Sequence, residues 1–205
     1  MIRFVESGMS FEFDENNCFR IELDDLVSKQ SYHNSTQNIK ACECVTVIDG
    51  NHCFIEAKSS APRKPFAKVN ELTLHGQSIP KNWETYDNYQ KFLRDISKKF
   101  IDSFSLLKSI TEGRHGIERM ESLPLYSKYL SLDQIRFILI VNLNTSKNVD
   151  KQSMSLLKDA ITNEMRPFLK IWNIPDKSVK VALPGDAKRL LRIPIIENKQ
   201  NFQEH

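Results

Sequence analysis

Two apolar runs that meet at Asp49-Gly50 constrain the fold of this chain more than any other feature. The first run spans residues 41–48, and the second begins at Cys53 and ends in Glu56-Ala57-Lys58. Asp-Gly between two such runs is typical of a tight β-hairpin, because both residues tolerate the positive φ of the turn. The sequence therefore predicts two neighbouring antiparallel strands.

This hairpin places three charged side chains on one face if its loop has an even number of residues. Side chains alternate between the faces of a strand, so Glu56 and Lys58 share a face of the second strand. A loop of two or four residues puts Glu43 on that same face, across from Glu56 or from Lys58, whereas a three-residue loop separates them. Asp49-Gly50 favours the two-residue loop.

Two carboxylates beside a lysine fit metal-dependent cleavage of phosphodiesters. Mg²⁺ prefers oxygen ligands, which Glu43, Glu56 and the backbone carbonyl of Ala57 would supply, and Mn²⁺ could substitute for it. A bound metal lowers the pKa of its water, and Lys58 would orient that water and offset developing negative charge. The alternative is structural: Lys58 could reach to solvent from a strand end, and Glu56 could face solvent in an alternating strand.

The remaining chain predicts an α/β domain. Short strands are expected at 3–6, 10–13 and 18–23, and a polar loop at 24–38, while residues 59–82 and 117–134 have no clear period. Apolar residues at three- and four-residue intervals predict a long helix over about 83–110, where Lys98 and Lys99 are expected at the surface, although one could point toward the site. A buried strand follows at 137–141, then a helix at 151–171 that Pro167 should kink or end, a strand at 179–183 and a short basic helix.

The segment Lys40-Ala-Cys-Glu-Cys-Val45 followed by Phe54-Ile-Glu-Ala-Lys-Ser-Ser60 resembles the core of the PD-(D/E)xK, or restriction-endonuclease-like, superfamily. In that family an acid on one strand precedes a carboxylate-x-lysine at the end of the next, and the later helix, strand, helix and strand follow the same order. The resemblance implies a mixed central sheet flanked by helices, in one domain over 1–205. We divide it into a β-rich N-terminal extension (1–38), a nuclease-like core (39–197) and a loose tail (198–205).

The chain departs from the family pattern at two places. Glu43 stands where the family usually has aspartate, and the N-terminus reads as strands where many members place a further acid on a helix. The candidates for that acid are Glu6, Glu12 and Glu22. Gln90 lies on the long helix, but no tyrosine follows at the spacing of the RecB-like branch.

Basic residues near the predicted site suit contact with a phosphate backbone. They are Arg63, Lys64 and Lys68 in the loop after the hairpin, and Lys188 and Arg189 on the last helix. The net charge of +3 permits a polyanionic partner without requiring one. The four cysteines lie mostly in apolar runs and predict core packing rather than a zinc site.

The resemblance implies a Mg²⁺-dependent deoxyribonuclease, similar to subunits of bacterial or phage defence and repair systems, with DNA and further protein subunits or a second copy as partners. One alternative is a nuclease-fold protein that no longer cuts and serves as a nucleic-acid-binding or scaffold subunit. Another is an interaction module of unrelated fold. The sequence has no apolar stretch of membrane-spanning length and no signal-peptide pattern at its start, so we expect a cytoplasmic protein without membrane contact.

Overall fold

The computed structural model describes residues 1–23, 39–62, 83–123, 131–142 and 151–196. The strands are β1 (Ile2–Glu6), β2 (Met9–Phe13), β3 (Cys18–Phe19), β4 (Cys44–Ile48), β5 (Asn51–Lys58), β6 (Ile135–Val141), β7 (Val179–Ala182) and β8 (Ile195–Ile196). The α-helices are α3 (Trp83–Thr111), α4 (Ile117–Ser122), α5 (Lys151–Ile171) and α6 (Pro184–Leu190). The fold is mixed α/β, with a mixed five-stranded sheet flanked by helices.

The five-stranded sheet has the order β3-β4-β5-β6-β7. Strands β3, β4 and β5 pair antiparallel, and β5, β6 and β7 pair parallel. The parallel neighbours are joined through α3 and through α5, as parallel pairing requires a long crossover. The carboxyl ends of β5 and β6 therefore lie side by side at one edge of the sheet.

The β4–β5 hairpin has the predicted two-residue loop. Ile48 pairs with Asn51, and Asp49 and Gly50 have φ values of 48° and 73°. Both positive φ values match the type I′ turn that fits the right-handed twist of the strands. The even loop is confirmed, and it fixes the register of every pair along the hairpin.

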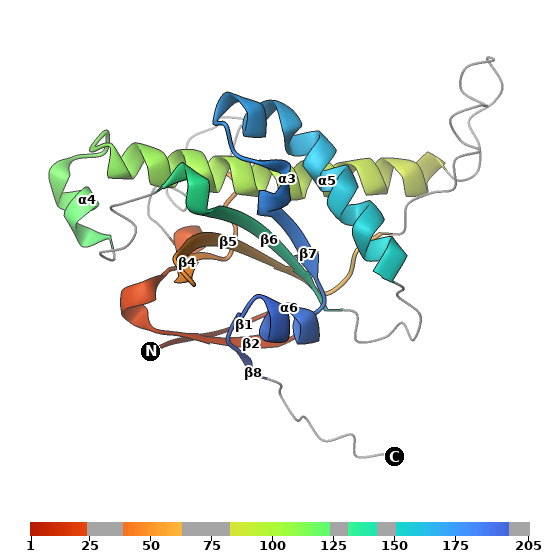
Figure 1. The fold of residues 1–205 in the computed structure, drawn as a ribbon, viewed down its shortest axis with the longest axis horizontal. Helices are drawn as coiled ribbons and strands as arrows, with labels where there is room; N and C mark the ends of the chain where they lie inside the picture. The colour runs from red at the N-terminus through yellow and green to blue at the C-terminus, as the bar shows by residue number, and fades with distance from the viewer. Residues whose placement is uncertain (24–38, 63–82, 124–130, 143–150, 197–205) are drawn as a thin grey trace.

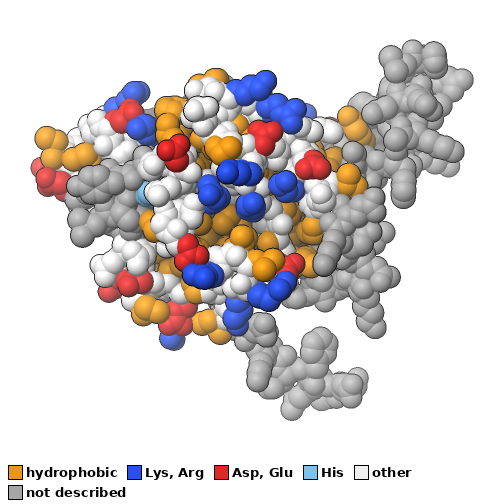
Figure 2. Space-filling view, viewed as in Figure 1, with side chains coloured by type: hydrophobic (Ala, Val, Ile, Leu, Met, Phe, Trp, Pro, Cys, Tyr) orange, Lys and Arg blue, Asp and Glu red, His pale blue; other side chains and the backbone are white. Residues whose placement is uncertain are grey.

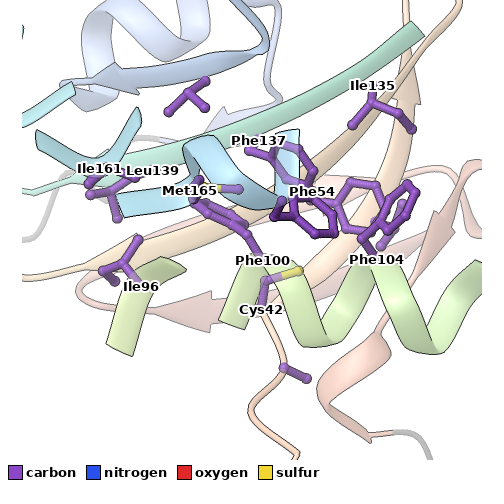
Figure 3. Close-up of a cluster of buried hydrophobic side chains, with 14 of the residues drawn as sticks. Cys42, Phe54, Ile96, Phe100, Phe104, Ile135, Phe137, Leu139, Ile161 and Met165 are labelled. Carbon is purple, nitrogen blue, oxygen red and sulfur yellow. The ribbon is translucent and has the colours of Figure 1, made fainter. Parts of the chain in front are cut away.

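One face of this sheet packs on α3 and α5, as Figure 1 shows. Figure 3 shows the centre of that layer, where Phe54 and Phe137 from the strands meet Phe100 and Phe104 from α3. All four rings are fully buried. Helix α3 presents an apolar residue every three or four positions, so an apolar stripe along the helix packs on the sheet. Gly113, with φ 74°, ends the helix in a left-handed conformation.

The opposite face packs on a second, three-stranded sheet of order β1-β2-β8 and on α6. Phe11 and Phe13 of β2 and Ile195 of β8 are buried between the layers, together with Ile55 and Ile138 of the large sheet. The turn of the β1–β2 hairpin lies at Ser7 and Gly8, which have φ values of 52° and 74°.

Several predicted elements differ from the structure. The strand expected over 18–23 is only Cys18–Phe19, followed by a 3₁₀ helix at Ile21–Leu23, and the strand expected from Ala41 begins at Cys44. Helix α5 continues through Pro167, so it does not end there, which was one of the two expected outcomes. Pro167 and Asn163 are both exposed, so water can satisfy the carbonyl that the proline leaves without a donor. The predicted loop at 24–38 and the tail at 198–205 lie outside the described residues.

Candidate functional site

The hairpin register brings Glu43 and Glu56 together at the open end of the hairpin. Cys44 pairs with Ile55, so Glu43 lies opposite Glu56, and the Glu43 amide donates to the Ile55 carbonyl at 2.9 Å. Glu43 precedes the first residue of β4, while Glu56 and Lys58 end β5. Phe54 packs on α3 from the same face of β5, so all three charged side chains lie on the α3 side of the sheet.

Two lysine side chains contact the buried Glu56 carboxylate. Glu56 is 0% exposed, and its Oε1 lies 2.5 Å from Lys58 Nζ and 2.7 Å from Lys99 Nζ. Lys99 comes from α3 and also reaches Glu43 Oε1, at 3.7 Å. Of the two lysines expected at the surface, Lys99 is therefore the one that points into the site, while Lys98 pairs with Asp102.

The second oxygen of Glu56 differs from the first. Glu56 Oε2 is buried and has no hydrogen-bond partner within the described part of the chain. Buried carboxylate oxygens are ordinarily satisfied, because leaving one without a donor or cation costs free energy. This oxygen therefore has a free acceptor position. We call the group of Glu43, Glu56, Lys58 and Lys99 the carboxylate–lysine cluster.

Burial sets the protonation behaviour of the cluster. Desolvation raises the pKa of Glu56 and of Glu43, and the nearby lysines offset only part of that increase. Burial opposes the charge of Lys99, but attraction to Glu56 and Glu43 outweighs it and the pKa of Lys99 is raised. Burial thus favours the neutral form of each carboxyl, whereas the raised pKa of Lys99 depends on the negative charge that the carboxylates carry when they are ionised.

The Ala57 carbonyl lies in a small hydrogen-bonded network beside the carboxylates. Carbonyls two residues apart on a strand point the same way, so the Ala57 carbonyl points to the side on which Ile55 pairs with Glu43. Ser7 Oγ donates to it at 3.0 Å, which leaves one lone pair of this oxygen available. Asn142, which directly follows β6, joins the turn to β5. Its side-chain amide donates to the Ser7 carbonyl at 2.9 Å, and its backbone N–H donates to the Lys58 carbonyl at 2.7 Å.

The contacts of Glu6, Glu12 and Glu22 distinguish among the three acids proposed for the N-terminus. Glu6 lies 3.3 Å from Ser7 Oγ, and its charge contributes to the raised pKa of Glu43. Glu12 instead pairs with Arg3, and Glu22 pairs with Arg20. Glu6 is therefore the candidate that we associate with the carboxylate pair, through its charge effect on Glu43.

The predicted nucleic-acid contacts are placed only in part. Lys188 and Arg189 are exposed on α6, where Arg189 pairs with Asp186 at 3.0 Å. Arg63, Lys64 and Lys68 lie outside the described residues. Figure 2 shows further Lys and Arg side chains on the face that carries α5, β7 and α6.

One group on this face was not predicted. Burial lowers the pKa of Lys180 on β7, and the neighbouring charges of Lys158, Arg136 and Lys177 lower it further. No ion pair to Lys180 or Lys177 occurs among the residues that the structure describes. This group therefore has an excess of positive charge.

The four cysteines lie in the core, and the oxygen ligands of the carboxylate–lysine cluster are the candidates for metal binding. Cys18, Cys42, Cys44 and Cys53 are free and buried in the two apolar layers, as core packing predicts. Across the described ranges, no group of three or more His, Cys, Asp or Glu side chains is arranged to hold a metal ion. The carboxylates of Glu43 and Glu56, one of which has the unsatisfied Oε2, and the Ala57 carbonyl with its free lone pair nevertheless make an oxygen-rich donor set that suits Mg²⁺.

Sequence reasoning did not identify Ser7 or Asn142 as part of this site, and it left open which of Lys98 and Lys99 would point toward it. Lys99 lies three positions after Ile96 and four before Ser103, so it is a charged residue on the face of the helix that turns toward the sheet. This position could have indicated that Lys99 points toward the site. Asn142 directly follows the apolar run of residues 137–141, and the carboxyl ends of parallel strands are frequent ligand positions. Nothing in the sequence around Ser7 indicated that the turn would reach β5.

Comparisons of the chain with protein-family models, curated proteins and solved structures give no match. The fold and the carboxylate–lysine cluster therefore define a mixed α/β protein with a candidate acid–lysine site at a sheet edge. Among the described helices, none is both long and apolar enough to cross a membrane.

Proposed function

We propose that this protein is a Mg²⁺-dependent nuclease of the restriction-endonuclease-like class that hydrolyses DNA phosphodiester bonds. One observation carries the proposal: Glu43, Glu56 and Lys58 lie together at one edge of the sheet, and the buried Glu56 Oε2 lacks a partner among the described residues. The element order β4, β5, α3, β6, α5 and β7 supports the same class, since it follows the order of the family that the motif resembles.

The residues have distinct roles in this proposal. Glu43, Glu56 and the Ala57 carbonyl would hold Mg²⁺ or Mn²⁺, and the bound cation would lower the pKa of a water molecule and offset charge on the attacked phosphate. Lys58 is about one-third exposed, so its ammonium can reach a substrate while remaining beside Glu56. There it would orient the attacking water and stabilise the negative charge that develops in the transition state.

Glu6 is the N-terminal acid that we assign to this site. It lies on the turn whose Ser7 hydroxyl donates to the Ala57 carbonyl, so β1 and β2 would hold it next to the cation. The basic residues on α5, β7 and α6 would attract the phosphate backbone of DNA. This attraction would weaken with added salt and would not depend on the DNA sequence.

The proposal is tested with the full chain on supercoiled plasmid and single-stranded DNA, with Mg²⁺ or Mn²⁺ and with EDTA. We expect metal-dependent cleavage that falls by about 100-fold or more in Glu56→Gln and in Lys58→Ala. Lys91→Ala is the matched control, because Lys91 is an exposed lysine on α3 away from the cluster. Equal cleavage by wild type and Lys58→Ala would overturn the catalytic assignment.

A second function is favoured by Lys99. Because its ammonium lies 2.7 Å from Glu56 and 3.7 Å from Glu43, the carboxylates already have a counter-ion without a metal. This arrangement suits a nuclease-fold protein that binds nucleic acid or a partner subunit without cutting. Salt-dependent DNA binding with no cleavage under any metal condition would select this second function over the first.

A further inference from the structure

We infer that Lys99 is a built-in competitor for the cation site, so that a divalent cation binds Glu43 and Glu56 only by displacing its ammonium. The inference rests on the proposed metal site and goes beyond it, because it assigns a regulating role to a residue of α3 that the motif does not contain. Its basis is the position of Lys99 Nζ, 2.7 Å from Glu56 Oε1 and 3.7 Å from Glu43 Oε1.

The position of Lys99 is set by contacts on both sides of it along α3. Asp95, four residues earlier, pairs with Lys40 at 2.5 Å. Ser103, four residues later, accepts a hydrogen bond from the Cys42 amide at 2.8 Å. Residues four apart lie on one helix face, so the helix turns on either side of Lys99 are joined to the segment that leads into Glu43. Lys99 is therefore held over the carboxylates and is not a surface lysine that meets them by chance.

The competition follows from the shared carboxylates. A divalent cation held by Glu43 and by the free Glu56 Oε2 would still lie beside the ammonium that contacts the Oε1 atoms of both residues, and two positive groups so close together repel each other strongly. Lys58 also contacts Glu56 Oε1, but its contact to Glu43 is longer range and its side chain is more exposed than that of Lys99. Lys99 is the ammonium that approaches both carboxylates within 4.0 Å.

Lys98 provides a matched control for the charge change. It is the adjacent residue on the same helix, but it pairs with Asp102 at 2.8 Å and is about half-exposed. Lys99→Met and Lys98→Met each remove one positive charge while keeping an unbranched aliphatic side chain of similar length. A difference between the two variants therefore reports the contact with the carboxylates rather than the change in net charge.

The test is Mn²⁺ binding by isothermal titration calorimetry to the full-length wild type, Lys99→Met, Lys98→Met and Glu56→Gln. If Lys99 competes, Lys99→Met binds Mn²⁺ about tenfold more tightly or better, within the range of coupling between ligands of one site, and Lys98→Met matches the wild type. Glu56→Gln should bind Mn²⁺ more weakly than the wild type whether or not Lys99 competes, because the substitution removes a carboxylate ligand.

Thermal unfolding provides a second readout that does not depend on cleavage. Lys99→Met should unfold at a lower temperature than wild type without metal, and saturating Mn²⁺ should raise its midpoint more than it raises that of the wild type. If Lys99→Met does not fold, Lys99→Gln replaces it in both measurements. Equal Mn²⁺ affinity in wild type and Lys99→Met, with loss in Glu56→Gln, would overturn the competitor role and leave the metal site intact. No binding by any variant would overturn both.

Discussion

The packing of Phe104 gives the sharpest prediction about how α3 is held over the site. Its ring is fully buried and meets aromatic rings on several sides, at centroid distances of 5.0 Å to Trp172, 5.2 Å to Phe168, 6.1 Å to Phe54 and 6.5 Å to Phe137. It therefore joins α3 to α5 and to two strands of the sheet. We expect Phe104→Ala to lower the free energy of unfolding and to loosen α3, which carries Lys99, relative to β5, which carries Glu56.

The size of the effect can be worked out from burial. A Phe side chain buries about 150–250 Å², which at about 25 cal/mol per Å² corresponds to about 4–6 kcal/mol as an upper estimate. Measured Phe→Ala costs in cores are about 3–5 kcal/mol, and they are larger where the surroundings cannot collapse into the cavity. Rings contributed by two strands and a helix cannot easily move inward together. We therefore expect about 4 kcal/mol, a large share of the roughly 5–15 kcal/mol that ordinary domains possess.

Urea unfolding followed by far-ultraviolet circular dichroism measures this loss, with fluorescence as a second probe because Trp172 contacts the substituted ring. Ser105→Ala is the matched control, since Ser105 is the next residue on α3 and is exposed. It should change stability by less than about 0.5 kcal/mol. A loss below about 1 kcal/mol in Phe104→Ala, with an unchanged denaturant slope, would refute the packing argument.

Three further predictions concern the hairpin, the Asn142 contact and the carboxylates. Gly50→Ala should cost about 1–2 kcal/mol because φ is 73°, although the nearest atom to a new Cβ is 4.0 Å away; Gly185→Ala, in a helix without that φ, should not destabilise in the same urea titration. Asn142→Ala removes a buried side-chain donor to the β1–β2 turn and should cost about 1–2 kcal/mol by urea unfolding, whereas no change would show that the turn is held by other contacts. Since burial raises the pKa of Glu43 and Glu56, the native state binds protons there more tightly than the unfolded chain, so stability rises as pH falls through the raised pKa and declines as pH increases. Wild type should therefore lose stability relative to Glu56→Gln as the pH rises above the ordinary glutamate pKa of 4.5, and a stability difference that does not change with pH would contradict the assignment.

The parts of the fold that local chemistry determines were predictable. Asp49-Gly50 determined the loop length, and the loop length determined that Glu43 lies opposite Glu56. The apolar stripe of α3 and the apolar run at residues 137–141 of β6 were also predictable, because each depends on residues close in sequence.

The missing parts depend on contacts between distant segments. The second sheet forms because Ile195 and Ile196 pair with residues 10 and 11, almost the whole described chain apart. Lys99 enters the site because α3 lies over β5 at one particular rotation, which the packing of Phe100 and Phe104 on Phe137 sets. Periodicity identifies which residues a helix buries, but it does not determine which residue at the edge of that stripe meets a partner on the sheet.

The charge balance of the cluster connects the two candidate functions. Two buried carboxylates with Glu6 nearby would repel one another, and the two lysines offset that repulsion without any metal. When this buried pair is ionised, it needs a cation beside it, either an ammonium or a metal ion. Lys99 supplies the first, and the unsatisfied Glu56 Oε2 remains a ligand for the second. If the proposed function holds, the choice between cutting and binding depends on how strongly one ammonium group holds two carboxylates, and the Lys99→Met and Lys98→Met pair measures this directly.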